Sequence, residues 1–197
     1  MSALAPDRLA GLLRQALAQD KTVFLQVSSG SMAPLLRAGD QIEVRAATVA
    51  ELTVGDILLL EAPAALFSHR FWGTAAEAGE SWLVTRGDRM LSFDPLWKSG
   101  QLLGKIIGWR REGRYYNLAG PAGQQLNELL ARLSAAELNF FARLYGRPEL
   151  TALPAATGPA LNFHQVDRSR LLTFLIRQLF KVRAKRIIRR QLARLLD

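Results

Sequence analysis

The chain has 197 residues, of which 49% are hydrophobic, and a formal net charge of +9. This length suits one folded domain with short appendages, because it allows a substantial apolar core to be buried. The absence of cysteine excludes disulfides, thiolate metal sites and cysteine nucleophiles, and the presence of only two histidines argues against a histidine-rich metal centre. We therefore expect neither a metal nor a cofactor.

Neither a membrane-spanning segment nor a secretion leader is expected. A helix that crosses a bilayer needs about 20 predominantly apolar residues, and no such run occurs in the sequence. The first residues also lack the basic stretch followed by an apolar stretch that is typical of a leader. We therefore expect a cytoplasmic protein, either free or peripheral at the inner face of a membrane.

Residues 1–20 are expected to form an N-terminal amphipathic helix. Pro6 and Asp7 suit a first helical turn. Apolar side chains then recur at helical spacing, at Leu9, Leu12, Leu13, Ala16 and Leu17. With this spacing the helix is expected to cover one face of the domain that follows.

Residues 21–120 predict a compact, mainly β domain of antiparallel strands. Gln41–Arg45 alternates polar and apolar residues, as a half-buried strand does, and Ile57–Leu60 is continuously apolar, as a buried strand is. Further strand-like runs are separated by Gly, Asp and Pro, and they cover 22–27, 65–72, 81–85, 102–109 and 114–118. Short strands punctuated in this way favour a compact antiparallel fold.

Beyond residue 120 the hydrophobic period becomes helical. Residues 121–146 predict a helical extension, either unbroken or divided near Ser134, which would suit an N-cap with Glu137 at capping-box spacing. Residues 147–166 contain three prolines and predict a linker. Residues 167–197 predict a basic amphipathic C-terminal helix, because ten Arg or Lys stand there against two Asp.

The C-terminal helix carries nearly all of the net charge, and three roles of this helix stay open. It could dock on its own domain and leave a basic face in solvent. The stretch 168–196 could instead lie at an anionic membrane surface, as basic amphipathic helices do. It could also bind nucleic acid or an acidic partner, since charge alone does not separate these partners. Nucleic acid is the least expected of them.

The stretch Ser28–Pro34, directly after the first predicted strand, has the composition of a functional turn. Its Ser29-Gly30-Ser31 core permits a tight backbone path. A serine at the junction of a strand and a turn exposes its hydroxyl, and nearby backbone N–H groups can face an oxyanion. A plain polar loop would have the same composition, so the turn alone does not establish a nucleophile.

Other short blocks follow this turn in order. They are Gly39-Asp40, Gly55-Asp56-Ile57-Leu58, His69-Arg70, Thr85-Arg86-Gly87-Asp88 with Asp94, and Gly104-Lys105-Ile106-Ile107-Gly108. Together with Ser29–Pro34 they resemble the signal peptidase family across roughly half of the chain. The resemblance implies a β domain of the signal peptidase and LexA type, and a serine endopeptidase that cleaves a peptide or protein tail or leader. It also implies an extended substrate, bound as an added strand, with small residues near the cleavage site.

The resemblance implies catalytic roles for Ser31, His69 and Asp94. Ser31 takes the position of the nucleophile, and its backbone N–H and the side chain of Ser29 those of the oxyanion donors. The block that contains His69 matches the histidine-base type found in archaeal and endoplasmic-reticulum signal peptidases. Residues 22–97 contain no lysine, so the lysine base of the bacterial type has no candidate there. An imidazole has a reference pKa of about 6.5 and can accept a proton near neutral pH.

Asp94 is expected to orient His69, because a carboxylate that bonds one imidazole nitrogen fixes the tautomer and stabilises the imidazolium. Asp88 is the alternative orienting group, or else a structural turn residue. This block departs from the pattern of the histidine-type family at two positions. Arg89 stands where an asparagine is usual, and Phe93 stands where a second aspartate is usual.

Two other functions stay open. A catalytically inactive module could keep the same fold to hold an extended peptide or partner protein, with the basic tail as an anchor. A self-cleaving regulator related to the LexA repressor group would also share the fold. That group, however, needs a lysine base and carries a DNA-binding helical domain, for which 20 N-terminal residues are too few. Convergence of Ser31, His69 and Asp94 within hydrogen-bond reach would favour the peptidase.

Overall fold

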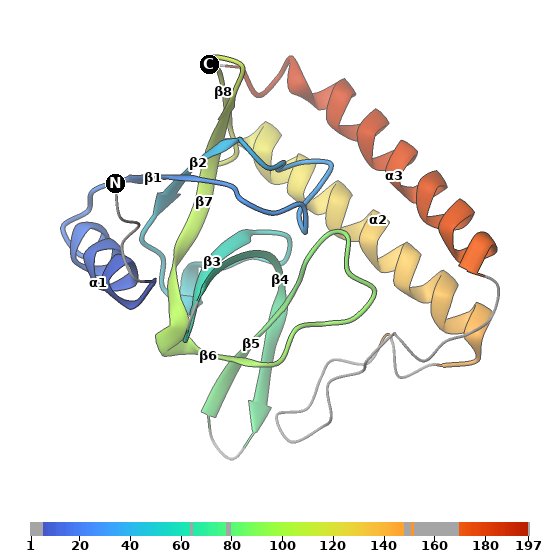
Figure 1. Cartoon of the computed structure of the whole chain (residues 1–197), viewed down its shortest axis with the longest axis horizontal. Coiled ribbons are helices and arrows are strands. Elements are labelled where there is room, and N and C mark those ends of the chain that lie inside the picture. The colour runs from blue at the N-terminus through green and yellow to red at the C-terminus, as the bar shows by residue number, and fades with distance from the viewer. Residues whose placement is uncertain (1–5, 64, 78–79, 148–150, 152–169, 197) are drawn as a thin grey trace.

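A computed structural model describes residues 6–63, 65–77, 80–147, 151 and 170–196. Within these ranges, eight strands form one antiparallel sheet, flanked by helices α1 (Pro6–Leu17), α2 (Pro121–Tyr145) and α3 (Arg170–Leu192) (Figure 1). The prediction of a mainly antiparallel β fold with an N-terminal helix and a C-terminal helical extension is confirmed. The predicted linker 147–166 lies outside the described residues except at Arg147 and Thr151.

The strands are β1 (Val23–Gln26), β2 (Gln41–Arg45), β3 (Ile57–Ala62), β4 (Ala65–Glu77), β5 (Glu80–Arg86), β6 (Trp97–Lys98), β7 (Leu102–Arg111) and β8 (Arg114–Asn117). Two short 3-10 helices, η1 (Val49–Glu51) and η2 (Ser99–Gln101), also lie in the described ranges. The sheet order is β1-β2-β7-β3-β4-β5-β6, and β8 also pairs with β7. The sequence did not predict β6, because two residues are too short to show an alternating pattern.

Strand β3 lies in the interior of the sheet and is covered on both faces. Ile57 and Leu59 pack in a large core together with residues of the three α-helices. Leu58 and Leu60 pack in a second cluster with residues of β4, β5, β6 and β7. All four side chains are at most 2% exposed. Burial on both faces explains why this strand is continuously apolar, whereas the alternating strand β2 exposes its two end residues and buries alternate ones.

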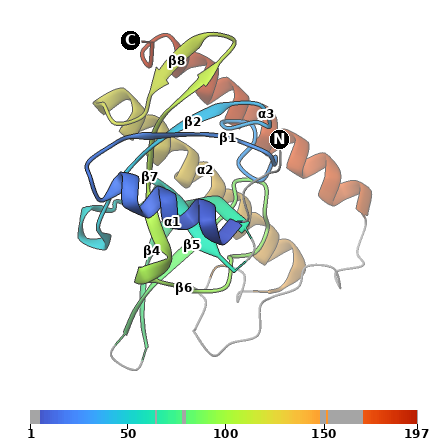
Figure 2. The ribbon, with the colours of Figure 1, turned by 60° about the vertical axis from the view of Figure 1, so that its left-hand side comes forward.

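Helix α1 covers one side of the sheet, as Figure 2 shows. Its apolar side chains Leu13 and Leu17 are buried in the large core, and Leu12 faces solvent. At its last turn Arg14 donates from Nε to Glu61 Oε2 at 3.0 Å. The helix therefore buries one apolar stripe, as its spacing predicts.

Helix α2 is a single unbroken helix of 25 residues that begins with Pro121 at its first position and ends at Gly146 in the left-handed conformation. Ser134 lies inside this helix and caps nothing. Its carbonyl instead accepts a hydrogen bond from Arg86 Nη2 at 3.1 Å. Ser134 resembles an N-cap in the sequence, but in the structure it makes a tertiary contact, which a local sequence pattern cannot show.

Helix α3 runs beside α2 in both ribbon views (Figures 1 and 2). The ring of Phe180 lies 6.4 Å from that of Phe140 on α2, and Ile188 is buried in the large core. Beyond α3, the backbone of Leu195 accepts a hydrogen bond from Asn117 N at 2.8 Å. The C-terminal segment thus docks on its own domain. No helix in the described part of the chain has the length and apolar character needed to cross a membrane.

Candidate active site

Ser31 opens a tight turn that follows β1. Within this turn Ala33 N donates to Gly30 O at 3.1 Å, and Leu36 N donates to Met32 O at 3.2 Å. Met32 and Leu36 are fully buried, whereas Ser31 is half-buried. The buried apolar side chains therefore fix the turn to the core, and Ser31 stays at the surface.

Asp40 in the first Gly-Asp block ties the far end of this turn to β7. Its carboxylate accepts a hydrogen bond from Arg37 N at 2.7 Å. It also receives a bidentate contact from Arg111, at 2.7 Å from Nε and 2.5 Å from Nη2. The same guanidinium donates to Leu35 O at 2.7 Å. This block therefore holds the serine turn in shape.

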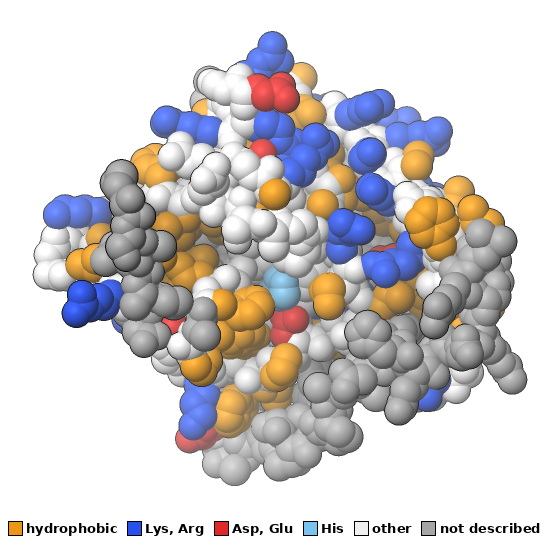
Figure 3. All heavy atoms as spheres, viewed as in Figure 1, with side chains coloured by type: hydrophobic (Ala, Val, Ile, Leu, Met, Phe, Trp, Pro, Cys, Tyr) orange, Lys and Arg blue, Asp and Glu red, His pale blue; other side chains and the backbone are white. Residues whose placement is uncertain are grey.

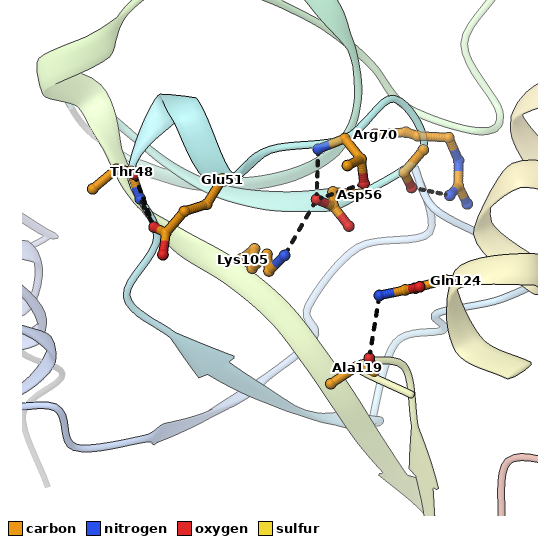
Figure 4. Close-up of polar contacts among 9 residues, drawn as sticks. Thr48, Glu51, Asp56, Arg70, Lys105, Ala119 and Gln124 are labelled. Atoms are coloured by element: carbon orange, nitrogen blue, oxygen red, sulfur yellow. Dashed lines mark hydrogen bonds and ion pairs between the residues drawn. The ribbon is translucent and has the colours of Figure 1, made fainter. Parts of the chain in front are cut away.

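The second Gly-Asp block fixes the start of β3 against β4. Gly55 has a φ of +107°, which favours glycine, and Gly55 N donates to Phe71 O at 2.9 Å. The Asp56 carboxylate accepts from Thr53 N at 3.0 Å and from Lys105 Nζ at 3.4 Å (Figure 4). Lys105 is thus engaged in a structural ion pair.

His69 lies on β4, opposite Leu58 of β3, and its side chain is buried, whereas that of Asp94 is half-buried. The imidazole Nδ1 is 2.6 Å from Asp94 Oδ2. Thr85 on β5 donates from Oγ1 to the same carboxylate oxygen at 2.6 Å, and Asp94 N donates to Thr85 O at 2.9 Å. A carboxylate oxygen accepts, so Nδ1 is the donor in this contact, and in the neutral imidazole Nε2 is then the acceptor.

Trp97 adds a further link to this chain of contacts. Its indole Nε1 donates to Thr85 Oγ1 at 2.9 Å, so the Thr85 hydroxyl accepts from Trp97 and donates to Asp94. Sequence reasoning assigned no role to Thr85, although it lies in one of the blocks that carry the family resemblance. Its position two residues before Gly87 gave no sign that its hydroxyl would reach Asp94.

Gly87 is where the histidine and the serine turn meet. A Cβ atom built on Gly87 would lie 3.0 Å from His69 Nε2 and 3.2 Å from Ser31 O. The neighbouring Arg89 N donates to that Ser31 carbonyl at 2.8 Å. Imidazole and turn therefore lie against the same glycine, and a side chain at this position would push them apart.

The Ser31 hydroxyl has no hydrogen bond to His69 in the described part of the chain, and its contact is with Ser29 Oγ at 3.5 Å. Catalytic hydrogen bonds are often long in ligand-free sites and tighten when substrate binds. Figure 3 shows a histidine side chain near the middle of one face, with an acidic side chain beside it. The imidazole is thus reached from this face.

Asp88, the alternative orienting acid, has a different partner. Its two carboxylate oxygens accept from Arg70 Nε and Nη2, each at 2.7 Å. Arg70 is completely buried and also donates from Nη1 to Gly55 O at 2.6 Å and to Asn127 Oδ1 at 3.2 Å. The structure thus places Asp94 against the imidazole and Asp88 against a buried guanidinium.

Asp88→Ala is expected to destabilise the fold by about 3–5 kcal/mol, because it leaves the buried charge of Arg70 without its carboxylate. Urea denaturation of the purified variant measures the loss. Glu128→Ala is the matched control, since Glu128 pairs with Arg132 on the solvent face of α2, where a pair contributes about 0.3–0.5 kcal/mol. Equal losses in the two variants would contradict a structural role for Asp88.

Arg86 adds a second buried charge next to Thr85. Burial lowers the pKa of its guanidinium to about 10, and the guanidinium lies 5.1 Å from the centre of the Trp72 ring. Burial likewise raises the pKa of the Glu137 carboxyl on α2, while the nearby Arg86 charge opposes the shift. The hydrogen bond from Arg86 Nη2 to Ser134 O holds the end of β5 against α2, next to the residue that bonds to Asp94.

No cluster of three or more His, Cys, Asp or Glu side chains that could hold a metal ion occurs among the described residues. The two acids of the site bond to His69 and Arg70. Beside Gly87 the site presents a hydroxyl, an imidazole and a carboxylate, from Ser31, His69 and Asp94.

Comparison with known proteins assigns no family to the chain. No family model matches it, and no curated protein sequence matches it. Its function must therefore be inferred from the residues of the site.

Proposed function

We propose that the chain is a serine endopeptidase of the signal peptidase type, which cleaves a peptide or protein tail or leader. Ser31 is the nucleophile and His69 is the general base. The proposal rests above all on the contact of 2.6 Å between His69 Nδ1 and the half-buried Asp94 Oδ2, beside a glycine that also adjoins the Ser31 backbone. An imidazole held by a carboxylate next to an accessible serine is the arrangement that activates a hydroxyl.

In the proposed mechanism His69 Nε2 accepts the Ser31 hydroxyl proton while Oγ bonds to the carbonyl carbon of the scissile peptide. The Nδ1–H bond to Asp94 stabilises the imidazolium that forms. The imidazolium then gives its proton to the amine nitrogen as the C–N bond breaks. A water molecule, deprotonated by the same nitrogen, hydrolyses the remaining ester and regenerates the serine.

The negative oxygen of the tetrahedral intermediate needs donors beside the nucleophile. The backbone N–H of Ser31 has no acceptor among the described residues, and Ser29 presents an exposed hydroxyl 3.5 Å from Ser31 Oγ. We propose these two groups as the oxyanion hole. One such donor contributes about 2.7–4 kcal/mol of transition-state stabilisation.

The substrate we propose is an extended peptide with small residues near the cleavage site, met in the cytoplasm or at the inner face of a membrane. The second candidate is a module that binds such a peptide without cleaving it. One observation favours the second candidate, namely that Ser31 Oγ bonds to no described atom of His69. The two candidates differ in whether peptide bonds are broken.

The test is mass-spectrometric profiling of a diverse peptide library, with wild type, Ser31→Ala and His69→Ala compared in parallel. We expect cleavage after small residues by the wild type and by neither variant. Cleavage that survives His69→Ala would overturn the histidine base. If the library stays intact while its peptides bind the wild type and Ser31→Ala equally, the binding module is the better description.

A further inference from the structure

The outer face of α3 is not used by the fold. The opposite face of the helix packs on the domain through Ala184 and Ile188, which are buried in the large core, with Ile187 and Leu192 beside them. The apolar stripe that would make the isolated helix amphipathic is therefore largely buried against the domain. What remains on the outside differs between the two halves of the helix.

The first half of this outer face carries exposed apolar side chains. Together with two residues at the adjoining end of α2, they form what we call the apolar patch: Phe140, Leu144, Phe174, Leu175, Leu179 and Val182. These side chains are between 41% and 65% exposed. They make up half of the large hydrophobic side chains that are exposed among the described residues. Such a concentration on a surface marks a contact site.

The second half of the outer face carries exposed cations, which we call the basic strip: Arg183, Lys185, Arg186, Arg189 and Arg190. None of them forms an ion pair with another described residue, and α3 itself contains no acidic residue. Figure 3 shows hydrophobic side chains at the right-hand edge, over the start of α3, and Lys and Arg side chains along the upper right. The apolar patch and the basic strip thus adjoin on one surface.

We propose that this surface binds an anionic lipid bilayer, with the apolar patch entering the interface and the basic strip lying over the headgroups. Apolar side chains flanked by cations are the combination that anchors a peripheral helix, since hydrophobic burial and attraction to anionic lipids add together. The binding is peripheral. The membrane proposal does not depend on the peptidase chemistry, so the two proposals can be tested separately.

The composition of the surface separates a bilayer from a nucleic acid. Binding to a phosphate backbone depends on cations and is strongly weakened by salt, and it has no use for the exposed Leu175 and Leu179. A bilayer uses both sets of side chains. The apolar patch therefore favours lipid as the partner of the basic strip.

The first test is flotation of the purified full-length protein with vesicles of phosphatidylcholine alone or mixed with phosphatidylglycerol. We expect binding to the mixed vesicles only. One cation near an anionic surface is worth about fivefold in affinity, so Arg186→Glu with Arg190→Glu should weaken binding by at least about 25-fold. The control pair Arg114→Glu with Arg132→Glu makes the same charge change at other exposed sites and should retain most of the binding.

The second test reports on the apolar patch. The chain has no cysteine, so Leu179→Cys can carry a single environment-sensitive dye, with Val54→Cys as the exposed control on a different surface. We expect the emission of the dye at position 179 alone to shift to the blue with mixed vesicles. Leu175→Glu with Leu179→Glu should weaken flotation by about tenfold or more, and Leu12→Glu with Val54→Glu should not.

Three results would overturn the proposal. One is that the wild type does not float with the mixed vesicles, or that the basic-strip variant and its control bind them equally well. Another is tighter binding to duplex DNA than to vesicles, dependent on Arg186 and Arg190 but not on Leu175 and Leu179. The third is a concentration-dependent dimer that Leu175→Glu with Leu179→Glu abolishes, which would assign the apolar patch to a second copy of the chain.

Discussion

Ser31→Ala is expected to lower kcat by about 10⁶-fold, the size of effect that follows loss of the nucleophile in a serine peptidase. The residual rate comes from groups that still bind substrate and face the oxyanion. The measurement is single-substrate kinetics on a peptide that the library identifies. Urea denaturation of the variant should match wild type, because the half-exposed hydroxyl contacts Ser29 alone among the described residues.

Ser29→Ala is the matched control for this prediction, since the two hydroxyls lie 3.5 Å apart on the same turn. Loss of one oxyanion donor lowers kcat by about 10²–10³-fold, so Ser29→Ala should remain measurably active. The opposite ranking of the two variants would make Ser29 the nucleophile. Equal and small losses in both would remove the catalytic proposal altogether.

Much of the fold follows from local patterns in the sequence. The alternating run Gln41–Arg45 forms β2 over those same residues, and the continuously apolar run that begins at Ile57 forms the doubly covered strand β3. In a pleated strand, successive side chains point to opposite faces, so the local pattern indicates whether one face or both faces are buried. Helix α2 was the harder case, because Ser134 has the spacing of an N-cap in the sequence and yet lies inside one unbroken helix, where it contacts Arg86.

The candidate site could be predicted only in part, because its residues come from different strands and loops. Asp88 and Asp94 are both carboxylates in one short segment, and the spacing does not reveal that Arg70 pairs with the first and His69 with the second. The link from Trp97 through Thr85 to Asp94 likewise depends on the pairing of β5 with β6. Such partners are set by tertiary packing.

The outer face of α3 shows a similar limit. The sequence pattern places apolar residues along the whole helix, and it does not say which of them the domain covers. The structure buries Ile188 and exposes Leu179. Only this division separates the residues that hold the helix in place from those left exposed on its outer face.

Asp94→Asn is expected to lower kcat by about 10⁴-fold with little change in KM. An amide presents its NH₂ or its oxygen to the imidazole and no longer fixes Nδ1 as the donor, so His69 can take the tautomer that cannot act as a base. It also provides no negative charge to stabilise the imidazolium. Steady-state kinetics on the same peptide measures both constants.

Asp88→Asn separates this effect from a general disturbance of the loop. Its partner Arg70 is buried beneath it, so the variant should lose stability while its folded fraction keeps a kcat within about tenfold of wild type. The two variants thus have opposite defects: Asp94→Asn lowers kcat, and Asp88→Asn lowers the stability toward urea. An Asp94→Asn protein that is as active as wild type, or an Asp88→Asn protein that is folded but inactive, would transfer the orienting role from Asp94 to Asp88.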